Sequence, residues 1–219
     1  MRGPDELVEA RRRMVEEQLR QRGIADPRVL AAMAAVPRER FVDRAWLEQA
    51  YGDEPLPIGF GQTISQPYMV ALICELLEVG PGARVLDVGA GSGYQAAVLA
   101  ELGGTVDAIE RIEALAAQAR RRLAKAGYAD RVRVHVGDGS MGLPDRAPFD
   151  AIAVAAAAPE LPAALYEQLA AGGRLVVPVG RRREQQLQLI VRTPAGPVVR
   201  RSVPCRFVPL VGEGGFPEA

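Results

Sequence analysis

The stretch Val85-Leu86-Asp87-Val88-Gly89-Ala90-Gly91-Ser92-Gly93-Tyr94 decides the fold of this 219-residue chain. An apolar run contains an acidic residue near its end, three glycines follow at alternate positions, and a helix-forming segment comes next. This pattern predicts a buried strand that turns sharply into a helix. Glycines let the backbone approach a ligand closely, and the start of the next helix offers free N–H groups. We therefore expect a nucleotide-like ligand with a polar tail at this loop.

Other interpretations of the glycine-rich loop fit less well. Residues 91–96 also match G-x-G-x-x-A, a dinucleotide-binding fingerprint, but the extra Gly89 separates that motif from the strand. A P-loop is excluded because no Gly-Lys-Ser/Thr follows the glycines. The remaining alternative is a tight turn that binds nothing.

Composition excludes several classes of protein. The chain has 27 basic and 27 acidic residues, whereas a general nucleic-acid or membrane-surface binder needs a basic excess. No apolar run has membrane-spanning length, and the charged residues 1–13 do not resemble a secretory signal, so we expect a cytoplasmic protein. Cys74 and Cys205 form no CxxC motif and His135 is the only histidine. We therefore expect no metal site, and nothing favours a disulfide.

Strands and helices alternate after the glycine loop. Expected strands at 105–109, 132–136, 149–154 and 174–177 are separated by expected helices at 112–126 and 161–169. This order predicts an α/β fold with a doubly wound, mostly parallel sheet. Segments 187–191 and 197–207 have no long helix between them, which predicts antiparallel C-terminal strands. Upstream, helical segments precede an irregular loop at 55–61 and a helix at 68–77, which predicts an N-terminal helical cap.

We interpret residues 1–219 as one domain. Residues 1–80 would form the helical cap and a substrate loop, 81–180 the ligand-binding core, and 181–219 the C-terminal strands and tail. Asp87, Glu110 and Asp138 each stand near the carboxyl end of an expected strand, where doubly wound sheets bind ligands. Glu110 can accept both hydroxyl protons of a ribose, and Asp138 the exocyclic amine of an adenine. Taken singly, each acid could equally cap the following helix.

The motif Asp-x-Gly-x-Gly-x-Gly resembles the signature of methyltransferases that use S-adenosylmethionine (AdoMet). Three acids suit that ligand, because it carries a sulfonium and an amino group. Longer blocks resemble the protein-L-isoaspartate O-methyltransferase family, and they extend from the first helix to Val211: Ala35-Val36-Pro37-Arg38-Glu39-Arg40-Phe41-Val42, Pro57-Ile58-Gly59, Gln62-Thr63-Ile64-Ser65-Gln66-Pro67-Tyr68-Met69-Val70, Gly137-Asp138-Gly139, Val177-Pro178-Val179-Gly180 and Arg206-Phe207-Val208-Pro209-Leu210-Val211.

The resemblance implies a fold and an activity. The fold would be a Rossmann-like class I methyltransferase with a seven-stranded sheet. The activity would be methylation of the free α-carboxylate of L-isoaspartyl residues in damaged proteins, after which the ester cyclises to a succinimide and some normal Asp is regained. A carboxylate is already ionised at pH 7 and needs alignment instead of a general base. The single His135, in an alternating strand, would therefore have no catalytic role.

The resemblance also assigns residues. Ser65 would be catalytic, orienting the substrate carboxylate, and it would bind the isoaspartyl peptide together with Gln66, Val208, Pro209, Leu210 and Val211, whose backbone would pair with the peptide as an added strand. AdoMet would be bound by Thr63, Ile64, Tyr68, Asp87, Gly89, Gly91, Gly93, Glu110, Arg111, Asp138 and Gly139. We expect a monomer that acts on isoaspartyl proteins and peptides and binds no nucleic acid or membrane.

Two other functions remain open. One is a related carboxylate methyltransferase that acts on a dedicated biosynthetic peptide. The other is a non-catalytic AdoMet-binding module, against which Ser65 and the intact acidic positions argue.

Overall fold

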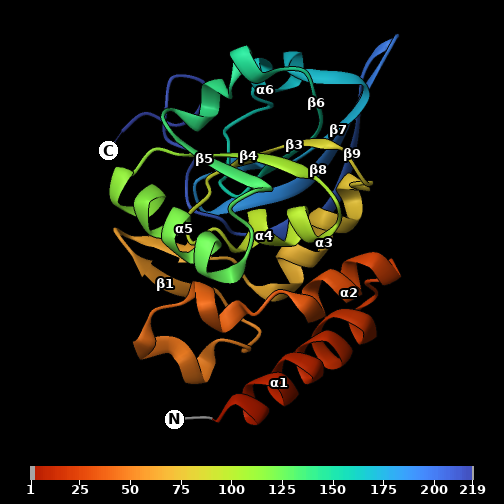
Figure 1. The fold of residues 1–219 in the computed structure, drawn as a ribbon. Coiled ribbons are helices and arrows are strands. Elements are labelled where there is room, and N and C mark those ends of the chain that lie inside the picture. Colours follow the sequence, from red (N-terminus) through yellow and green to blue (C-terminus); the bar gives the residue numbers. More distant parts are fainter. Residues whose placement is uncertain (1–2, 219) are drawn as a thin grey trace.

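The computed structural model describes residues 3–218, which form a mixed seven-stranded sheet with helices on both faces (Figure 1). The strand order is β5-β4-β3-β6-β7-β8-β9, in which β3 to β7 run parallel and β8 and β9 are antiparallel to their neighbours. The strands are β3 (Arg84–Val88), β4 (Thr105–Glu110), β5 (Val132–Val136), β6 (Phe149–Val154), β7 (Leu169–Arg181), β8 (Glu184–Thr193) and β9 (Gly196–Cys205). This arrangement confirms the predicted doubly wound sheet with antiparallel C-terminal strands.

Helices α3, α4 and α5 cover one face of the sheet and α6 lies on the other (Figure 1). The α-helices are α1 (Pro4–Arg13), α2 (Pro27–Ala35), α3 (Pro67–Leu77), α4 (Tyr94–Glu101), α5 (Glu113–Ala126) and α6 (Ala163–Glu167). Short 3-10 or π segments are η1 (Met14–Leu19), η2 (Arg20–Arg22), η3 (Arg38–Phe41), η4 (Arg44–Gln49), η5 (Gly139–Met141) and η6 (Pro144–Arg146). The N-terminal helices pack beneath α3 and α4 as the predicted cap.

The turn from β3 into α4 needs its glycines. Gly89, Gly91 and Gly93 have φ angles of 85°, 50° and 88°, in the left-handed region that side chains disfavour. The N–H groups of Gly89 and Ala90 both donate to the carbonyl of Ile109, at 2.9 and 3.1 Å. The end of β4 therefore fixes the loop, and α4 starts directly after it.

The structure differs from the sequence-based expectation between residues 55 and 64. The expected irregular loop is a hairpin, in which β1 (Leu56–Gly59) pairs antiparallel with β2 (Gln62–Ile64). Phe60 and Gly61 form its two-residue turn, both with positive φ, at 52° and 70°. Such turns usually carry Asn-Gly or Asp-Gly, so this sequence gave no hairpin signal.

A second difference lies around residue 169. The helix expected at 161–169 is only the short α6, and β7 begins at Leu169 instead of Arg174. Gly172 and Gly173 lie within β7, beside a register irregularity opposite Phe149 and Ala151, where the pairing with β6 shifts.

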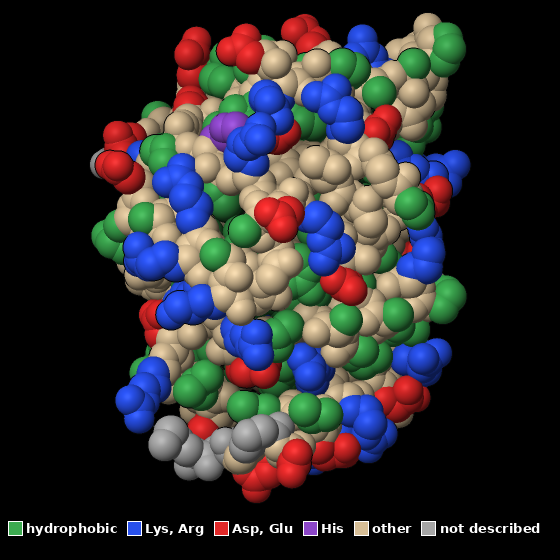
Figure 2. All heavy atoms as spheres, viewed as in Figure 1, with side chains coloured by type: hydrophobic (Ala, Val, Ile, Leu, Met, Phe, Trp, Pro, Cys, Tyr) green, Lys and Arg blue, Asp and Glu red, His purple; other side chains and the backbone are tan. Residues whose placement is uncertain are grey.

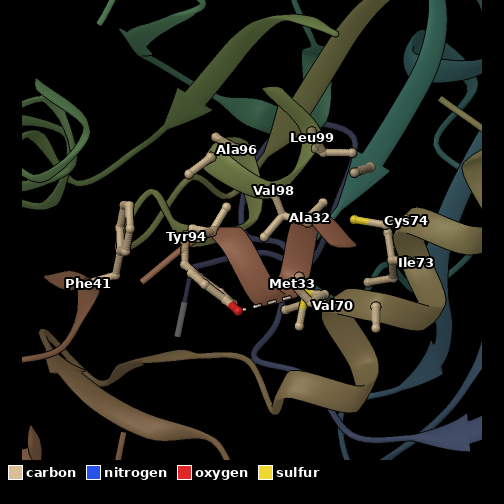
Figure 3. Packing of buried hydrophobic residues seen from close by; sticks show 14 of the residues in the cluster. Ala32, Met33, Phe41, Val70, Ile73, Cys74, Tyr94, Ala96, Val98 and Leu99 are labelled. Carbon is tan, nitrogen blue, oxygen red and sulfur yellow. Dashed lines mark hydrogen bonds between the residues drawn. The ribbon is translucent and has the colours of Figure 1, made fainter. Parts of the chain in front are cut away.

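The apolar core joins the cap to the sheet (Figure 3). The ring of Tyr94 points toward Met33 of α2, its hydroxyl lies 3.7 Å from the Met33 sulfur, and its centroid lies 5.6 Å from that of Phe41. Tyr94 and Ile73 are almost fully buried. The first residue of α4, which follows the glycine loop, is thus held by the cap.

Replacing Ile73, which is fully buried in α3, should leave a cavity between the cap and the sheet. We expect Ile73→Ala to lower the free energy of unfolding by about 2–5 kcal/mol, measured by denaturant titration. Val8→Ala is the control, because Val8 is 56% exposed and should change stability by less than about 0.5 kcal/mol. Equal effects of the two substitutions would contradict the packing described above.

Candidate active site

A cavity lies at the carboxyl ends of the central strands, where the glycine loop meets the hairpin β1–β2 and the segment after β9. Its walls come from segments that are far apart in the sequence. They are Gln62–Ser65 with Val70, Val88–Ser92 with Tyr94 and Gln95, Ile109–Ile112 at the end of β4, Gly139, Ala155 with Ala156, and Val208–Val211. Twelve of the residues assigned from the sequence line it: Thr63, Ile64, Ser65, Gly89, Gly91, Glu110, Arg111, Gly139, Val208, Pro209, Leu210 and Val211.

Glu110 is the acidic side chain that lines the cavity. It is 6% exposed, and its two oxygens accept hydrogen bonds from the N–H groups of Gly91 at 3.0 Å and Ile112 at 2.9 Å. An ionised carboxylate can accept about four hydrogen bonds, so about two positions are left for a ligand diol. The geometry is consistent with the predicted ribose contact.

Asp87 lies beneath the loop and does not line the cavity. It is fully buried, its Oδ1 accepts a hydrogen bond from Nε2 of Gln95 at 2.7 Å, and Gln95 lines the cavity. Oδ2 of Asp87 and Oε1 of Gln95 have no partner among the described residues. Burial raises the pKa of Asp87 to about 7, a rise that Gln95 opposes and the Glu110 charge assists. Asp87 therefore acts on the cavity through Gln95.

Asp138 binds the C-terminal tail. Its carboxylate accepts from the N–H of Ser140 at 2.9 Å and from the N–H of Glu213 at 2.8 Å. Burial alone would raise the pKa of Asp138, but these bonds and the Ser140 hydroxyl hold it below its usual value. Gly139 lines the cavity and Asp138 does not. Because Glu213 lies 75 residues away, the sequence carried no signal for this partner.

Three other assigned residues also lie outside the cavity. The guanidinium of Arg22 lies over the ring of Tyr68, and its central carbon is 4.0 Å from the centroid of that ring. Gly93 is the N-cap residue just before α4, where a Cβ would come within 3.1 Å of Leu123. Gln66 lines a neighbouring groove. Lining residues that the sequence did not single out include Tyr94 and Gln95, which follow the glycine motif directly, and Ala155 and Ala156, which follow β6.

The neighbouring groove shares a wall with the cavity. The shared residues are Thr63, Ser65, Ala155, Val208 and Pro209. The rest of the groove is lined by Pro55, Gln66, Met69, Arg182, Pro204, Cys205, Arg206 and Phe207. Ser65 is half-buried, and its hydroxyl has no hydrogen-bond partner within residues 3–218. It can therefore donate to a group that reaches the boundary between cavity and groove.

The backbone of Val208–Val211 is partly used within the protein. The carbonyl of Val208 and the N–H of Leu210 bond to Ala157 at 2.8 and 2.7 Å, and the carbonyl of Leu210 accepts from Phe216. Proline has no N–H to donate, so Pro209 offers only its carbonyl. A peptide that added as a strand along this segment would therefore find fewer free backbone N–H and carbonyl groups than the sequence suggested.

His135 lies away from both the cavity and the groove. Its Nε2 lies 2.7 Å from Oδ1 of Asp107, and the side chain of Arg146 lies 3.4 Å from Oδ2. This pairing gives the histidine a structural partner in the sheet. Within residues 3–218 there is no cluster of three or more His, Cys, Asp or Glu that could hold a metal ion, and no helix long and apolar enough to cross a membrane.

Acidic and basic side chains are interspersed over the face shown in Figure 2, with His135 in purple near basic residues. This surface matches the balanced composition of the chain.

The buried Asp87 predicts a pH dependence of stability. The pKa of Asp87 is about 7 in the folded protein, above the value of 3.8 in the unfolded chain. Its contribution to the free energy of unfolding is therefore fully present below about pH 4 and is lost as the pH rises through about 7. Asparagine does not ionise, so the Asp87→Asn variant does not lose stability in this way. The free energy of unfolding of the variant minus that of the parent should therefore increase from pH 4 to pH 8, by up to roughly 4 kcal/mol. Denaturant titrations across that range measure it, with exposed Asp130→Asn as control. Parallel pH curves for Asp87→Asn and the parent would show that Asp87 is not the titrating group.

Comparison with known proteins agrees with this geometry. The family model described as protein-L-isoaspartate(D-aspartate) O-methyltransferase matches residues 9–215. Protein-L-isoaspartate O-methyltransferases of Hyperthermus butylicus and Aeropyrum pernix are 52% and 54% identical, over 96% and 100% of this chain and 92% and 85% of theirs.

Solved structures give the same relationship. A Plasmodium falciparum structure described as a protein-L-isoaspartate O-methyltransferase in complex with S-adenosyl-L-homocysteine has a TM-score of 0.81 and 29% identity, over 92% of this chain and 98% of that one. Another protein-L-isoaspartate O-methyltransferase has a TM-score of 0.83 at 29% identity, over 93% of this chain and 66% of its own. With a family match over nearly the whole chain, this protein belongs to the protein-L-isoaspartate O-methyltransferase family.

Proposed function

We propose that this protein transfers a methyl group from AdoMet to the free α-carboxylate of L-isoaspartyl residues, which starts their repair through a succinimide. The observation that carries the proposal is the position of Ser65, in the wall shared by the cavity and the groove. A donor at that boundary can hold a peptide carboxylate from the groove against a group bound in the cavity. No feature of the site favours a dedicated biosynthetic peptide instead.

The residues of the cavity fit AdoMet. Glu110 has hydrogen-bonding positions left for a ribose, and the unpartnered Oε1 of Gln95 is an acceptor for an amino group. Side chains are excluded where the ligand would lie close to the backbone, since a Cβ at Gly91 would come within 3.2 Å of Ile58 and one at Gly139 within 2.8 Å of Val88. When bound, AdoMet supplies an electrophilic methyl group on its sulfonium.

Ser65 positions the carboxylate. Its hydroxyl is half-buried and has no partner within the described chain, so it can donate to a carboxylate oxygen. The carboxylate is ionised at neutral pH and requires no proton transfer. The protein needs to align it and exclude water, which agrees with the position of His135 away from both hollows.

Fixed main-chain groups explain preference for isoaspartate over aspartate. The Val208–Val211 segment is held by Ala157 and Phe216, so it cannot move freely to suit a different substrate backbone. A normal Asp carboxylate leaves the peptide backbone at another point, and small misplacements cost about 10²-fold in rate. We also propose that the enzyme acts as a monomer in the cytoplasm, on isoaspartyl proteins and peptides, without nucleic acid or membrane.

Glu110→Ala should weaken AdoMet binding by ~10-fold or more, because a charged hydrogen-bond acceptor is lost and the loop loses its tie to Gly91. Isothermal titration calorimetry measures the affinity. Glu113→Ala, at the exposed start of α5, is the matched control and should bind AdoMet normally. Unchanged affinity in Glu110→Ala would mean that the ribose is held elsewhere.

Ser65→Ala should lower the rate of isoaspartyl methylation by ~10²-fold while AdoMet affinity stays within a few-fold, because the substitution removes the carboxylate donor only. Turnover is measured on matched isoAsp and Asp peptides, with Ser202→Ala, an exposed serine on β9, as control. Parent-level turnover in Ser65→Ala would contradict the role of Ser65. Equal methylation of the two peptides by the parent would contradict the proposed function.

A further inference from the structure

The charged side chains that line the groove are both arginines. Arg182 comes from the turn between β7 and β8, and Arg206 comes from the segment that follows β9. No Asp or Glu is among the described residues that line the groove. A peptide lying there meets two cationic groups next to the wall that carries Ser65, although the protein as a whole has balanced charge.

The positive charges of both arginines are available to a peptide in the groove. Arg206 is exposed, between Cys205 and Phe207, which also line the groove. Arg182 is also exposed, donates to the carbonyl of Pro217 at 3.0 Å, and lies 5.0 Å from the ring centroid of Phe216. A carbonyl and an aromatic ring orient a guanidinium without neutralising it. Arg182 is thus held in place as a cation.

Acidic residues near the groove in sequence do not line it. Glu184 pairs in register with Arg181 across the β7–β8 turn. Asp53 and Glu54 precede Pro55, and Asp53 forms an ion pair with Arg22 at 2.6 Å. The lining of the groove is therefore cationic.

We propose that Arg182 and Arg206 are specificity residues, and that the enzyme prefers isoaspartyl sites with an Asp or Glu side chain one or two residues away. The inference rests on the proposed function, since it assumes that the isoaspartyl peptide occupies the groove. An exposed ion pair adds up to about 1 kcal/mol, so we expect a preference of about 2- to 5-fold over an uncharged neighbour.

The test uses isoaspartyl peptides in which one position, −2, −1, +1 or +2, carries Glu, Gln or Lys. At one or more positions the Glu peptide should have a kcat/KM about 2- to 5-fold above the Gln peptide, mainly through KM, and the Lys peptide should be poorer. The preference should largely disappear in 0.5 M salt, since exposed charges are then screened. Equilibrium binding of the same peptides, labelled with a fluorophore, measures the preference without methyl transfer.

The double variant Arg182→Gln/Arg206→Gln should bring the Glu-to-Gln ratio close to one. Arg133→Gln is the control, because Arg133 is exposed on β5 at the opposite edge of the sheet and should leave the ratio intact. A ratio of one at all four positions in the parent, or an unchanged ratio in the double variant, overturns the inference while leaving the proposed function in place. Failure to methylate even the Gln peptides overturns both.

Discussion

The carboxylate of Glu110 holds together the two turns on which the cavity depends. One oxygen accepts the N–H of Gly91 in the glycine loop, and the other accepts the N–H of Ile112 at the start of α5. The preceding carbonyl, of Ile109, accepts from Gly89 and Ala90. A buried anion is stable where several donors surround it, and here backbone groups supply them. The end of β4 therefore fixes the loop backbone, which could not otherwise keep its positive φ angles in one arrangement.

The C-terminal tail connects the cavity to the groove. Asp138 and Ser140 hold its start through Glu213 and Gly214, and a side chain at Gly212 would collide with the Asp138 carboxylate. Its end reaches both hollows, because Glu218 pairs with Arg111 of the cavity at 2.5 Å and the Pro217 carbonyl accepts from Arg182 of the groove. The acid expected to contact adenine thus anchors the segment that borders both binding regions.

Local patterns in the sequence were sufficient for the sheet, the glycine loop and the position of Glu110, because strand–turn–helix signals lie within about ten residues of each other. Thr63–Ser65 and Val208–Val211, which also line the cavity, were assigned only through the family resemblance. Features that depend on distant partners were not accessible. The contact of the Tyr68 ring with Arg22 had no local signal in the sequence, and the assignment of Tyr68 to the cofactor stays a prediction. The hairpin β1–β2 was missed because its turn uses Phe60 at a position that normally favours Asn or Gly. Asp87 stands where the motif predicts, yet only its burial shows that it acts through Gln95.

The buried Arg38 explains how the helical cap takes part in the site. It is fully buried, its Nε donates to the carbonyl of Ala50 at 2.8 Å, and its guanidinium lies 5.0 Å from the ring centroid of Tyr94. Burial lowers the pKa of Arg38 to about 10, so it is still a cation at neutral pH. A cation over an aromatic ring offsets part of the cost of burial. Because Tyr94 lines the cavity and begins α4, the position of this part of the cavity wall depends on the contact with Arg38 of the cap.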